Sequence, residues 1–386
     1  MKTLKDADIK NKTVLLRADF NVTVEDGKVT EDFRMRAVLP TIRYLLENGA
    51  KKIAIMSHFG RPAGNDGKHT LAPVAEHLAK LLSLSVDFFA DAPGKGLREK
   101  IENSQHAVVV LENLRFYGGE EENGEGFAKE LASLGDVFVQ DAFGVMHRAH
   151  ASIVGAPKIL PAYAGLLVEK EVSTLSRVLS NPVRPLAVLI GGAKISTKIR
   201  VIEKFLNIAD NICLGGALAS TALKAKGMAV GKSLVEKGVA DKIKNIEFTD
   251  TRLHLPLDVK VAEDRDAKDG IFIRSAGNVG ENEIILDIGP DTQELFSDVI
   301  HRSKTIIWNG PMGYIENEAF REGTYRIARE LVAVSADTFT VVGGGDTYLI
   351  LEELEIMDKI SFVSTGGGAM LDFLADGTLP GIEALK

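Results

Sequence analysis

A run of three glycines followed by an acid stands directly after an apolar segment at residues 339–349, FTVVGGGDTYL. Glycine is unusual inside a strand because it packs no side chain and loses much entropy on ordering. Just before a helix, glycines let the backbone approach a phosphate, whose charge the helix N-terminus favours. Asp346 could hold Mg²⁺ there, directly or through water, or it could cap the following helix, which is worth about 1 kcal/mol. The segment alone supports a phosphate loop and leaves both roles of Asp346 open.

Other apolar runs in the second half of the chain also end in glycine-rich segments: IGGAK, LGGA, DIGPDT, WNGP and STGGGA. The segment GGAKISTK adds Lys194 and Lys198, whose ammonium groups could point at phosphoryl oxygens. Glu316 could accept hydrogen bonds from ribose hydroxyls, although an ordinary surface position is the better interpretation of that residue alone. This half of the chain therefore suits the phosphates of a nucleotide.

Polar and charged side chains follow four apolar segments of the first half, in RADFN, SHFGRP, ENLRF and QDAFGVMHRAH. The carboxyl ends of parallel strands share one edge of a sheet, and ligands bind there. The side chains expected at this edge are Arg17, Asp19, Asn21, His58, Arg61, Arg115, His147 and Arg148. Arg34 could join them, whereas Arg36, two residues further along a predicted helix, should face elsewhere. A single arginine is commonly a plain surface residue, but several at one edge indicate a site for a small, highly charged anion.

These residues need a scaffold that brings strand ends together. Short apolar runs alternate with amphipathic stretches, such as 70–83 and 196–210, and this pattern predicts parallel sheets covered by helices on both faces. We expect an α/β fold with two doubly wound, Rossmann-like domains, a long connecting helix and a cleft between the domains. Asn181-Pro182 should end that helix. The predicted parts are an N-terminal domain at 1–165, the helix at 166–182, a C-terminal domain at 183–370 and a final segment at 371–386.

Composition restricts the partners and the compartment. The chain of 386 residues has a formal net charge of -8, whereas a nucleic-acid partner would need a basic surface. Cys213 is the only cysteine, which excludes an intramolecular disulfide and fits a reducing compartment. The first residues lack the apolar core of a signal peptide, and no apolar stretch is long enough to span a bilayer. We expect a cytoplasmic protein with no nucleic-acid or membrane partner.

Two familiar nucleotide-binding motifs do not fit. The segment GMAVGKS at 227–233 has three residues between its glycines where a P-loop needs four, so we interpret it as a loop. No G-x-G-x-x-G opens the first βα unit, which disfavours an NAD-dependent dehydrogenase. A non-enzymatic binding protein for a phosphorylated metabolite would have no need of Lys194, Lys198 and Asp346. An anion site on one domain and a phosphate site on the other indicate a two-substrate kinase that closes to exclude water.

The sequence resembles the phosphoglycerate kinase family along nearly its whole length. The matching segments, in order, are LLRADFNV, MSHFGRP, LENLRFY, QDAFGVMHRAHAS, IGGAKISTKI, LDIGPDT, WNGPMGYIENEAF, VVGGGDT and FVSTGGGAMLDFLADGTLPGIEAL. The resemblance implies reversible phosphoryl transfer between ATP and the carboxylate of 3-phosphoglycerate, giving 1,3-bisphosphoglycerate and ADP in glycolysis and gluconeogenesis. It also implies Mg²⁺ with the nucleotide, small-molecule substrates as partners, and a monomer that works by hinge bending.

The resemblance also assigns residues to roles. Catalysis falls on Arg34, Lys194, Gly367 and Gly368, with Arg34 and Lys194 steadying the migrating phosphoryl group from the N- and C-terminal sides. Phosphoglycerate binding falls on Asp19, Phe20, Asn21, Arg34, His58, Phe59, Gly60, Arg61, Arg115 and Arg148. Nucleotide binding falls on Gly192, Lys198, Gly216, Asn309, Glu316, Gly344, Gly345, Asp346 and Thr347, with Asp346 as the metal ligand. The last residues, around LPGIEALK, are implied to return to the N-terminal domain.

Three positions depart from the family pattern. Thr23 stands where proline is usual, which changes only the stiffness of the chain. Ile285 replaces a glycine that lies against the nucleotide, and Tyr348 replaces a small residue that is also near the nucleotide. None of these changes removes a charged group needed for transfer. The expected differences therefore lie at the adenosine end and concern nucleotide preference.

Overall fold

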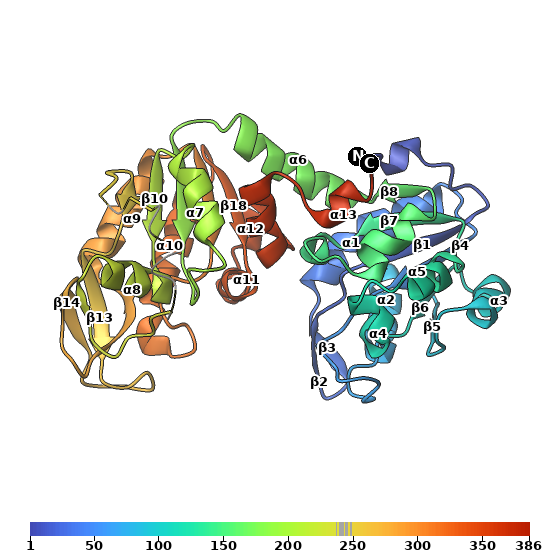
Figure 1. Cartoon of the computed structure of the whole chain (residues 1–386), viewed down its shortest axis with the longest axis horizontal. Helices are drawn as coiled ribbons and strands as arrows, with labels where there is room; N and C mark the ends of the chain where they lie inside the picture. The colour runs from blue at the N-terminus through green and yellow to red at the C-terminus, as the bar shows by residue number, and fades with distance from the viewer. Residues whose placement is uncertain (237, 239–242, 244–245, 248) are drawn as a thin grey trace. The chain divides into compact units, whose positions relative to one another are not determined.

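The computed structural model describes residues 1–236, 238, 243, 246–247 and 249–386, and it divides into two compact units. The first unit contains Met1–Thr174 and Thr378–Lys386, and the second contains Leu175–Gly377. Each unit is built around its own six-stranded sheet with helices packed on it (Figure 1). The prediction of two α/β domains with parallel sheets is thereby confirmed.

The sheet of the first unit is parallel throughout. Its spatial order is β5 (Val86–Phe89), β6 (Val108–Leu111), β4 (Lys52–Met56), β1 (Thr13–Ala18), β7 (Val137–Asp141) and β8 (Ala162–Ala164). The central strands are rich in Val, Ile and Leu and are buried on both faces, as strands between two helical layers must be. A short hairpin, β2 (Thr23–Glu25) and β3 (Lys28–Glu31), follows β1.

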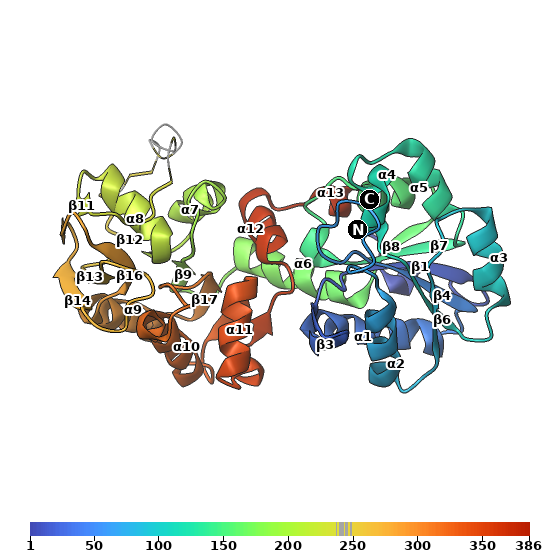
Figure 2. The same ribbon diagram turned by 90° about the horizontal axis from the view of Figure 1, so that it is seen from below.

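Helices cover both faces of this sheet. Figure 2 shows α1 (Phe33–Glu47) and α2 (Ala72–Leu82) on one side of the strands and α4 (Gly118–Glu121) and α5 (Glu125–Ala132) on the other. Apolar side chains of α1 and α2 pack with one set of alternating strand residues, and those of α3 (Lys95–Asn103) and α5 pack with the other set. The sheet is therefore the rigid layer from which the loops at its carboxyl edge project.

The connecting helix forms as α6 (Leu166–Ser180), and the boundary between the two units falls within it. Its start is fixed by Asp141 at the end of β7, whose Oδ1 accepts hydrogen bonds from the N–H groups of Leu167 and Val168 at 3.0 and 3.1 Å. Burial raises the pKa of Asp141 to about 7, although these hydrogen bonds oppose the shift. Asn181-Pro182 follows the last helical residue, as predicted.

The sheet of the second unit is also parallel throughout. Its spatial order is β12 (Leu253–His254), β10 (Asn211–Leu214), β9 (Leu186–Ile190), β17 (Thr305–Asn309), β18 (Phe339–Gly343) and β19 (Phe362–Val363). The helices are α7 (Ile199–Leu206), α8 (Gly216–Ala225), α9 (Pro290–Arg302), α10 (Glu322–Ala333), α11 (Gly345–Glu353) and α12 (Gly367–Asp376). Apolar side chains of α9, α10 and α11 form a core around Trp308, and α7 packs against α12.

Several elements differ from the sequence-based expectation. A three-stranded antiparallel sheet of β14 (Phe272–Ser275), β13 (Asp258–Ala262) and β16 (Ile284–Ile288) was not predicted, nor were β5, β8 and β12. The predicted helix at 196–210 begins only at Ile199, which leaves Lys194 and Lys198 in the preceding loop. The segment 227–233 is mostly loop, but two of its residues form β11 (Ala229–Val230), which pairs with β15 (Asn278–Val279).

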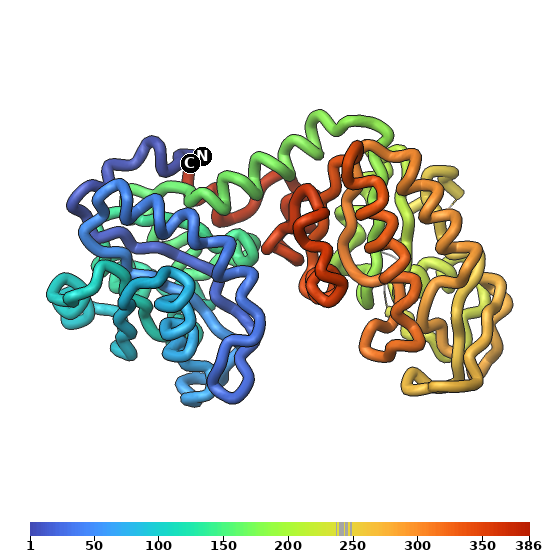
Figure 3. The backbone as a smooth tube through the Cα atoms, turned by 180° about the vertical axis from the view of Figure 1, so that it is seen from behind, coloured from blue at the N-terminus to red at the C-terminus, as the bar shows by residue number. Residues whose placement is uncertain are grey.

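The C-terminal segment Thr378–Lys386 belongs to the first unit. Its short helix α13 (Pro380–Glu383) packs against the π-helical turn η4 (Ala151–Gly155). The N–H of Gly381 donates to the carbonyl of Met146 at 2.9 Å, and Ile382 and Leu385 are buried. Figure 3 shows this segment, in red, ending beside the N-terminus.

Within the described part of the chain, every helix is too short or too polar to cross a membrane.

Candidate active site

A pocket of about 350 Å³, here called the basic pocket, lies at the carboxyl edge of the first sheet. Residues from the ends of β1, β4, β6 and β7, which are neighbours in that sheet, meet there with one residue of α1. Its lining is Asp19, Asn21, Arg34, His58, Gly60, Arg61, Arg115, Gly144, Val145, His147 and Arg148. Four arginines thus converge as the strand order predicts, on a site suited to an anion with several negative charges.

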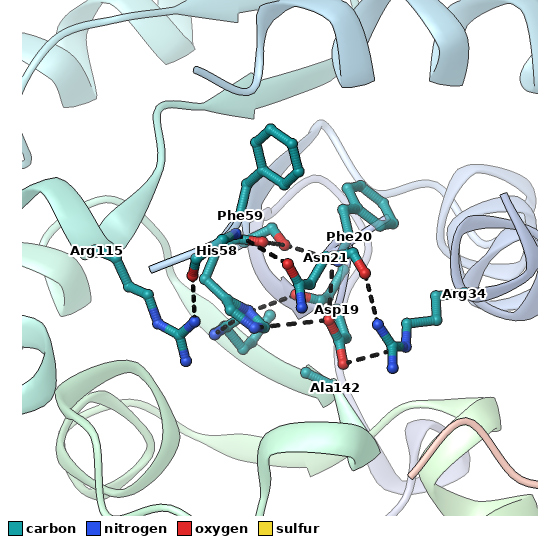
Figure 4. A network of polar contacts seen from close by, with 12 residues as sticks. Asp19, Phe20, Asn21, Arg34, His58, Phe59, Arg115 and Ala142 are labelled. Carbon is teal, nitrogen blue, oxygen red and sulfur yellow. Dashed lines mark hydrogen bonds and ion pairs between the residues drawn. The ribbon is translucent and has the colours of Figure 1, made fainter. Parts of the chain in front are cut away.

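Asp19 places a carboxylate among the basic side chains of this pocket. Figure 4 shows the side chains of Arg34 and His58 approaching it from two sides. Its carboxylate lies 3.9 Å from Arg34 Nε and 3.8 Å from His58 Nε2. Burial alone would raise the pKa of Asp19, but Arg34, His58 and Arg17 outweigh this effect and lower the pKa. The Asp19 carboxylate is therefore ionised at neutral pH and helps to hold both neighbours toward the pocket.

Backbone carbonyls orient two of the arginines. Arg34 Nη1 donates to the carbonyl of Asn21 at 2.5 Å, and Arg115 Nη1 donates to the carbonyl of Gly60. The N–H of Gly60 donates in turn to Asn21 Oδ1 at 2.9 Å, which ties the loops after β1 and β4 together. The loops and the guanidinium groups are thus arranged before any ligand arrives, which reduces the ordering that binding requires.

Three residues expected at this edge lie behind the pocket. Arg17 is only 1% exposed and lies within β1, so the expectation that it lines the edge is wrong. The side chain of Phe20 packs in the core, and its N–H donates to Ser57 Oγ at 2.8 Å. The Phe59 ring packs edge-on against His69. Phe20 and Phe59 therefore contribute backbone position, and their side chains support the loops.

A second pocket of about 500 Å³, here called the glycine-lined pocket, lies in the second unit. Gly192, Gly216 and Gly313 line it with the carboxylates of Glu316 and Asp346. Apolar residues such as Leu223, Val259, Ile284, Pro311 and Met312 complete the lining. A lining of glycine backbone and apolar side chains suits a phosphate chain attached to an aromatic base.

Lys198 is not part of this lining, but its Nζ lies close to Gly192, which is. It is buried, and its Nζ donates to the carbonyl of Gly191 at the end of β9. Burial lowers the pKa of Lys198 to about 8, although the nearby Asp346 carboxylate opposes the shift. A buried ammonium close to the backbone of Gly192 and Gly310 is a ready partner for a phosphate.

The three glycines of FTVVGGGDTYL form the turn from β18 into α11. Gly344 has a φ of +108°, which side chains disfavour, and it stands at the N-cap of α11. Asn309 lies beside this turn with a buried Nδ2 that makes no hydrogen bond within the described part of the protein. Thr347 is fully buried and its Oγ1 accepts the N–H of Gly310 at 2.9 Å, so it fixes the neighbouring loop.

Asp346 lies in the first turn of α11, whose N-cap is Gly344, so the alternative interpretation of Asp346 as the N-cap is wrong. It is exposed and lines the glycine-lined pocket. Gly367, at the start of α12, packs against the backbone of Gly344, which brings a second helix N-terminus to the same place. Gly368 and Lys194 are exposed nearby in sequence and are not part of the pocket lining.

Comparisons with known proteins identify the family. A family model described as phosphoglycerate kinase matches residues 4–377. A phosphoglycerate kinase of Thermus thermophilus is 46% identical over 391 residues, covering 100% of both chains. One of Moorella thermoacetica is 45% identical over 389 residues, covering 99% of this chain and 98% of its own.

The chain belongs to the phosphoglycerate kinase family. Its activity is phosphoryl transfer between ATP and 3-phosphoglycerate in glycolysis. Solved structures support the same assignment. The phosphoglycerate kinase from Pyrococcus horikoshii matches with a TM-score of 0.87 at 35% identity, covering 100% of this chain and 98% of that chain. The one from Coxiella burnetii matches with a TM-score of 0.83 at 38% identity, covering 99% and 98%.

Two departures from the pattern of the phosphoglycerate kinase family have different structural weight. Ile285 lines the glycine-lined pocket, and its N–H donates to Ser233 Oγ at 2.8 Å. Tyr348 is not part of the lining, and its hydroxyl donates to Glu352 on the same helix at 3.0 Å. Of the two, only Ile285 is placed to change the shape of the pocket.

Sequence reasoning overlooked other residues of the second site. Lys232 and Ser233, in the segment dismissed as a false P-loop, line the glycine-lined pocket together with Arg265. Asp287 is buried beneath the loop that carries Glu316, and its Oδ2 accepts the N–H of Gly323 at 2.8 Å. Burial raises the pKa of Asp287 to about 7. The LDIGPDT segment matched the family pattern, but nothing in it indicated that the carboxylate of Asp287 anchors the first turn of α10.

Proposed function

We propose that the basic pocket of the first unit binds 3-phosphoglycerate and that the glycine-lined pocket of the second unit binds ATP or ADP. The observation that carries this assignment is the contrast between the two pockets. One offers four arginines to a small polyanion, and the other offers glycine backbone and apolar side chains, with the buried Lys198 beside its Gly192. Asp19, Asn21, His58, Arg61, Arg115 and Arg148 serve the first substrate, and Lys198, Asn309, Glu316 and the glycines serve the second.

In the reaction, a carboxylate oxygen of 3-phosphoglycerate forms a bond to the γ-phosphorus of ATP while the bond to the leaving oxygen of ADP breaks. Negative charge is spread over the transferring group, so positioned cations and N–H donors stabilise it. Arg34 supplies a guanidinium from the phosphoglycerate side. Lys194 and the N-terminal amides of α12 at Gly367 and Gly368 serve the nucleotide side. Asp346 would hold the Mg²⁺ that accompanies the nucleotide, and the ion would offset the negative charge of the phosphates.

The transfer requires the two substrates to meet away from water, which would otherwise accept the phosphoryl group. Because the two pockets belong to separate units, we propose that turnover requires the units to close when both substrates are bound. Small-angle scattering should show a smaller radius of gyration with both substrates present than with either alone. An unchanged profile at saturation would contradict closure.

We also propose a cytoplasmic monomer that acts without nucleic-acid or membrane partners. The net charge of -8 and the single buried cysteine support this assignment.

The pocket assignment predicts that a substitution in one pocket weakens the binding of one substrate and leaves the binding of the other unchanged. Arg115→Met should weaken 3-phosphoglycerate binding by about tenfold to a hundredfold, because it removes a charged hydrogen-bond donor, and should leave ATP binding unchanged. Glu316→Gln should weaken ATP binding and leave 3-phosphoglycerate binding unchanged. Isothermal titration of each variant with each substrate separates the two effects. If either variant altered both affinities equally, the assignment of separate sites would be wrong.

A further inference from the structure

Arg17 is a charged side chain enclosed in the sheet of the first unit. It lies in β1, a central strand, and is only 1% exposed. Burial lowers the pKa of its guanidinium, and the carboxylate of Glu120 is the strongest of the effects that oppose this. Arginine nonetheless stays protonated in proteins. A buried cation of this kind needs buried partners, and here they form a series of hydrogen bonds, called the buried hydrogen-bond network.

The buried hydrogen-bond network joins Arg17 to Ser152 and Ser152 to Glu120. Arg17 Nε donates to Ser152 Oγ at 2.8 Å, and one Nη donates to the carbonyl of Ala18. Ser152 Oγ donates to Glu120 Oε1 at 2.6 Å, and the N–H of Ser152 donates to Glu120 Oε2 at 3.0 Å. Arginine has no acceptor, so the serine oxygen must accept from it and direct its single proton to the glutamate. Ser152 and Glu120 are both 0% exposed, which makes this a fixed buried network.

The same guanidinium contacts His58, which lines the basic pocket. Arg17 Nη2 lies 3.3 Å from His58 Nδ1. Because arginine only donates, Nδ1 must accept and cannot carry a proton. Burial lowers the pKa of His58 well below its ordinary value, and Arg17, Arg115 and Arg34 reinforce this effect against the opposing charge of Asp19. A neutral imidazole without a proton on Nδ1 carries it on Nε2.

The Nε2 atom of His58 lies on the side of Asp19. Asp19, the nearest carboxylate, has its Oδ1 3.8 Å from Nε2, which is too long for a hydrogen bond. Both residues belong to the pocket lining. An N–H on Nε2 therefore lies beside Asp19 in the pocket lining and makes no hydrogen bond to that carboxylate that would compete with a bound anion.

We propose that Glu120, Ser152 and Arg17 are positioning residues that hold His58 as a neutral imidazole protonated on Nε2, and thereby make it a hydrogen-bond donor to the bound 3-phosphoglycerate. This inference rests on the proposed function of the basic pocket. Without the buried hydrogen-bond network, the imidazole is free to exchange between its two tautomers. The form protonated on Nδ1 presents the lone pair of Nε2 to the anion.

Two-bond ¹H–¹⁵N spectra of the histidine side chains test the tautomer directly, with His58→Gln identifying the resonances. The wild-type protein should show Nδ1 of His58 unprotonated and Nε2 protonated across the neutral pH range. Protonation on Nδ1, or titration of His58 near neutral pH, would overturn the inference. This measurement uses the wild-type protein, so it is decisive even if variants of Arg17, Ser152 or Glu120 fail to fold.

A double-mutant cycle tests the consequence for the substrate. Ser152→Ala should raise the KM for 3-phosphoglycerate about tenfold and leave the KM for ATP unchanged, because a buried charge-assisted bond is lost beside only one pocket. In the His58→Gln background, whose amide has no tautomers, the same substitution should change this KM by less than about twofold. Equal effects in both backgrounds would show that Ser152 does not act through His58.

Ser303→Ala is the matched control. Ser303 is 1% exposed in the second unit, and its hydroxyl donates to the carbonyl of Val299 at 2.7 Å. This variant also loses a buried serine hydrogen bond and should keep both KM values.

Adding 3-phosphoglycerate to the wild-type sample tests the assignment of the basic pocket separately from the tautomer of His58. A shift of the His58 resonances supports binding in the basic pocket. No shift at saturation would contradict the pocket assignment itself. A shift of an imidazole protonated on Nδ1 would leave that assignment intact and overturn the tautomer alone.

Discussion

Arg34→Ala is expected to lower kcat by about 100-fold to 1000-fold, the loss typical of removing one positioned donor from a site of developing negative charge. Arg34 is held toward the basic pocket by the carbonyl of Asn21 and by the carboxylate of Asp19. The KM for ATP should stay near its wild-type value, because the nucleotide binds in the other unit. Steady-state kinetics with each substrate varied in turn measures both quantities.

Arg36→Ala is the matched control for this substitution. Arg36 lies two residues further along α1, is largely exposed, and pairs with Asp32 with 2.6 Å between Nε and Oδ1. Its loss removes the same charge from the same helix without touching the basic pocket, so kcat should be unchanged. A kcat near wild type for Arg34→Ala, or an equal loss for Arg36→Ala, would exclude Arg34 from the transfer step.

Lys198→Met is expected to raise the KM for ATP by about tenfold to a hundredfold, because a buried ammonium that meets a phosphate is replaced by an apolar chain of similar length. The pKa of about 8 adds a pH signature. Lys198 is charged below this pH and loses its charge above it. The wild-type kcat/KM for ATP should therefore fall as pH rises through about 8, and this fall should be absent from the variant.

Lys204→Met tests whether the effect belongs to the site. Lys204 lies on α7, shortly after Lys198, and is exposed. The substitution makes the same chemical change at a distance from the glycine loops and should alter neither the KM for ATP nor the pH profile. A pH profile of Lys198→Met that still falls near pH 8 would assign that titration to another group.

The basic pocket was predictable because parallel strands place their carboxyl ends at one edge. Asp19, His58, Arg115 and Arg148 therefore had to meet once the strands were recognised. The position of Arg17 was not predictable in this way. Both faces of β1 are buried, so the alternation of side chains does not distinguish a residue at the edge from one inside the sheet.

Other features could not be predicted from the sequence because they depend on residues that are far apart in it. Glu120 lies in the acidic run GGEEENG, which looks like a solvated surface, yet it is fully buried against Ser152. In the antiparallel sheet, β13 and β14 carry charged residues such as Lys260 and Arg274 within short strands, so a search for continuous apolar runs finds only β16. In both cases the deciding partner is distant in the sequence.

The return of Thr378–Lys386 to the first unit has a consequence for the order in which the protein is made. These nine residues are synthesised after the second unit, yet the N–H of Gly381 donates to the carbonyl of Met146 and α13 packs on the turn that carries Ser152. The second unit is complete in the chain before them. During translation, the first unit therefore leaves the ribosome early but acquires this packing only after the whole second unit has been synthesised.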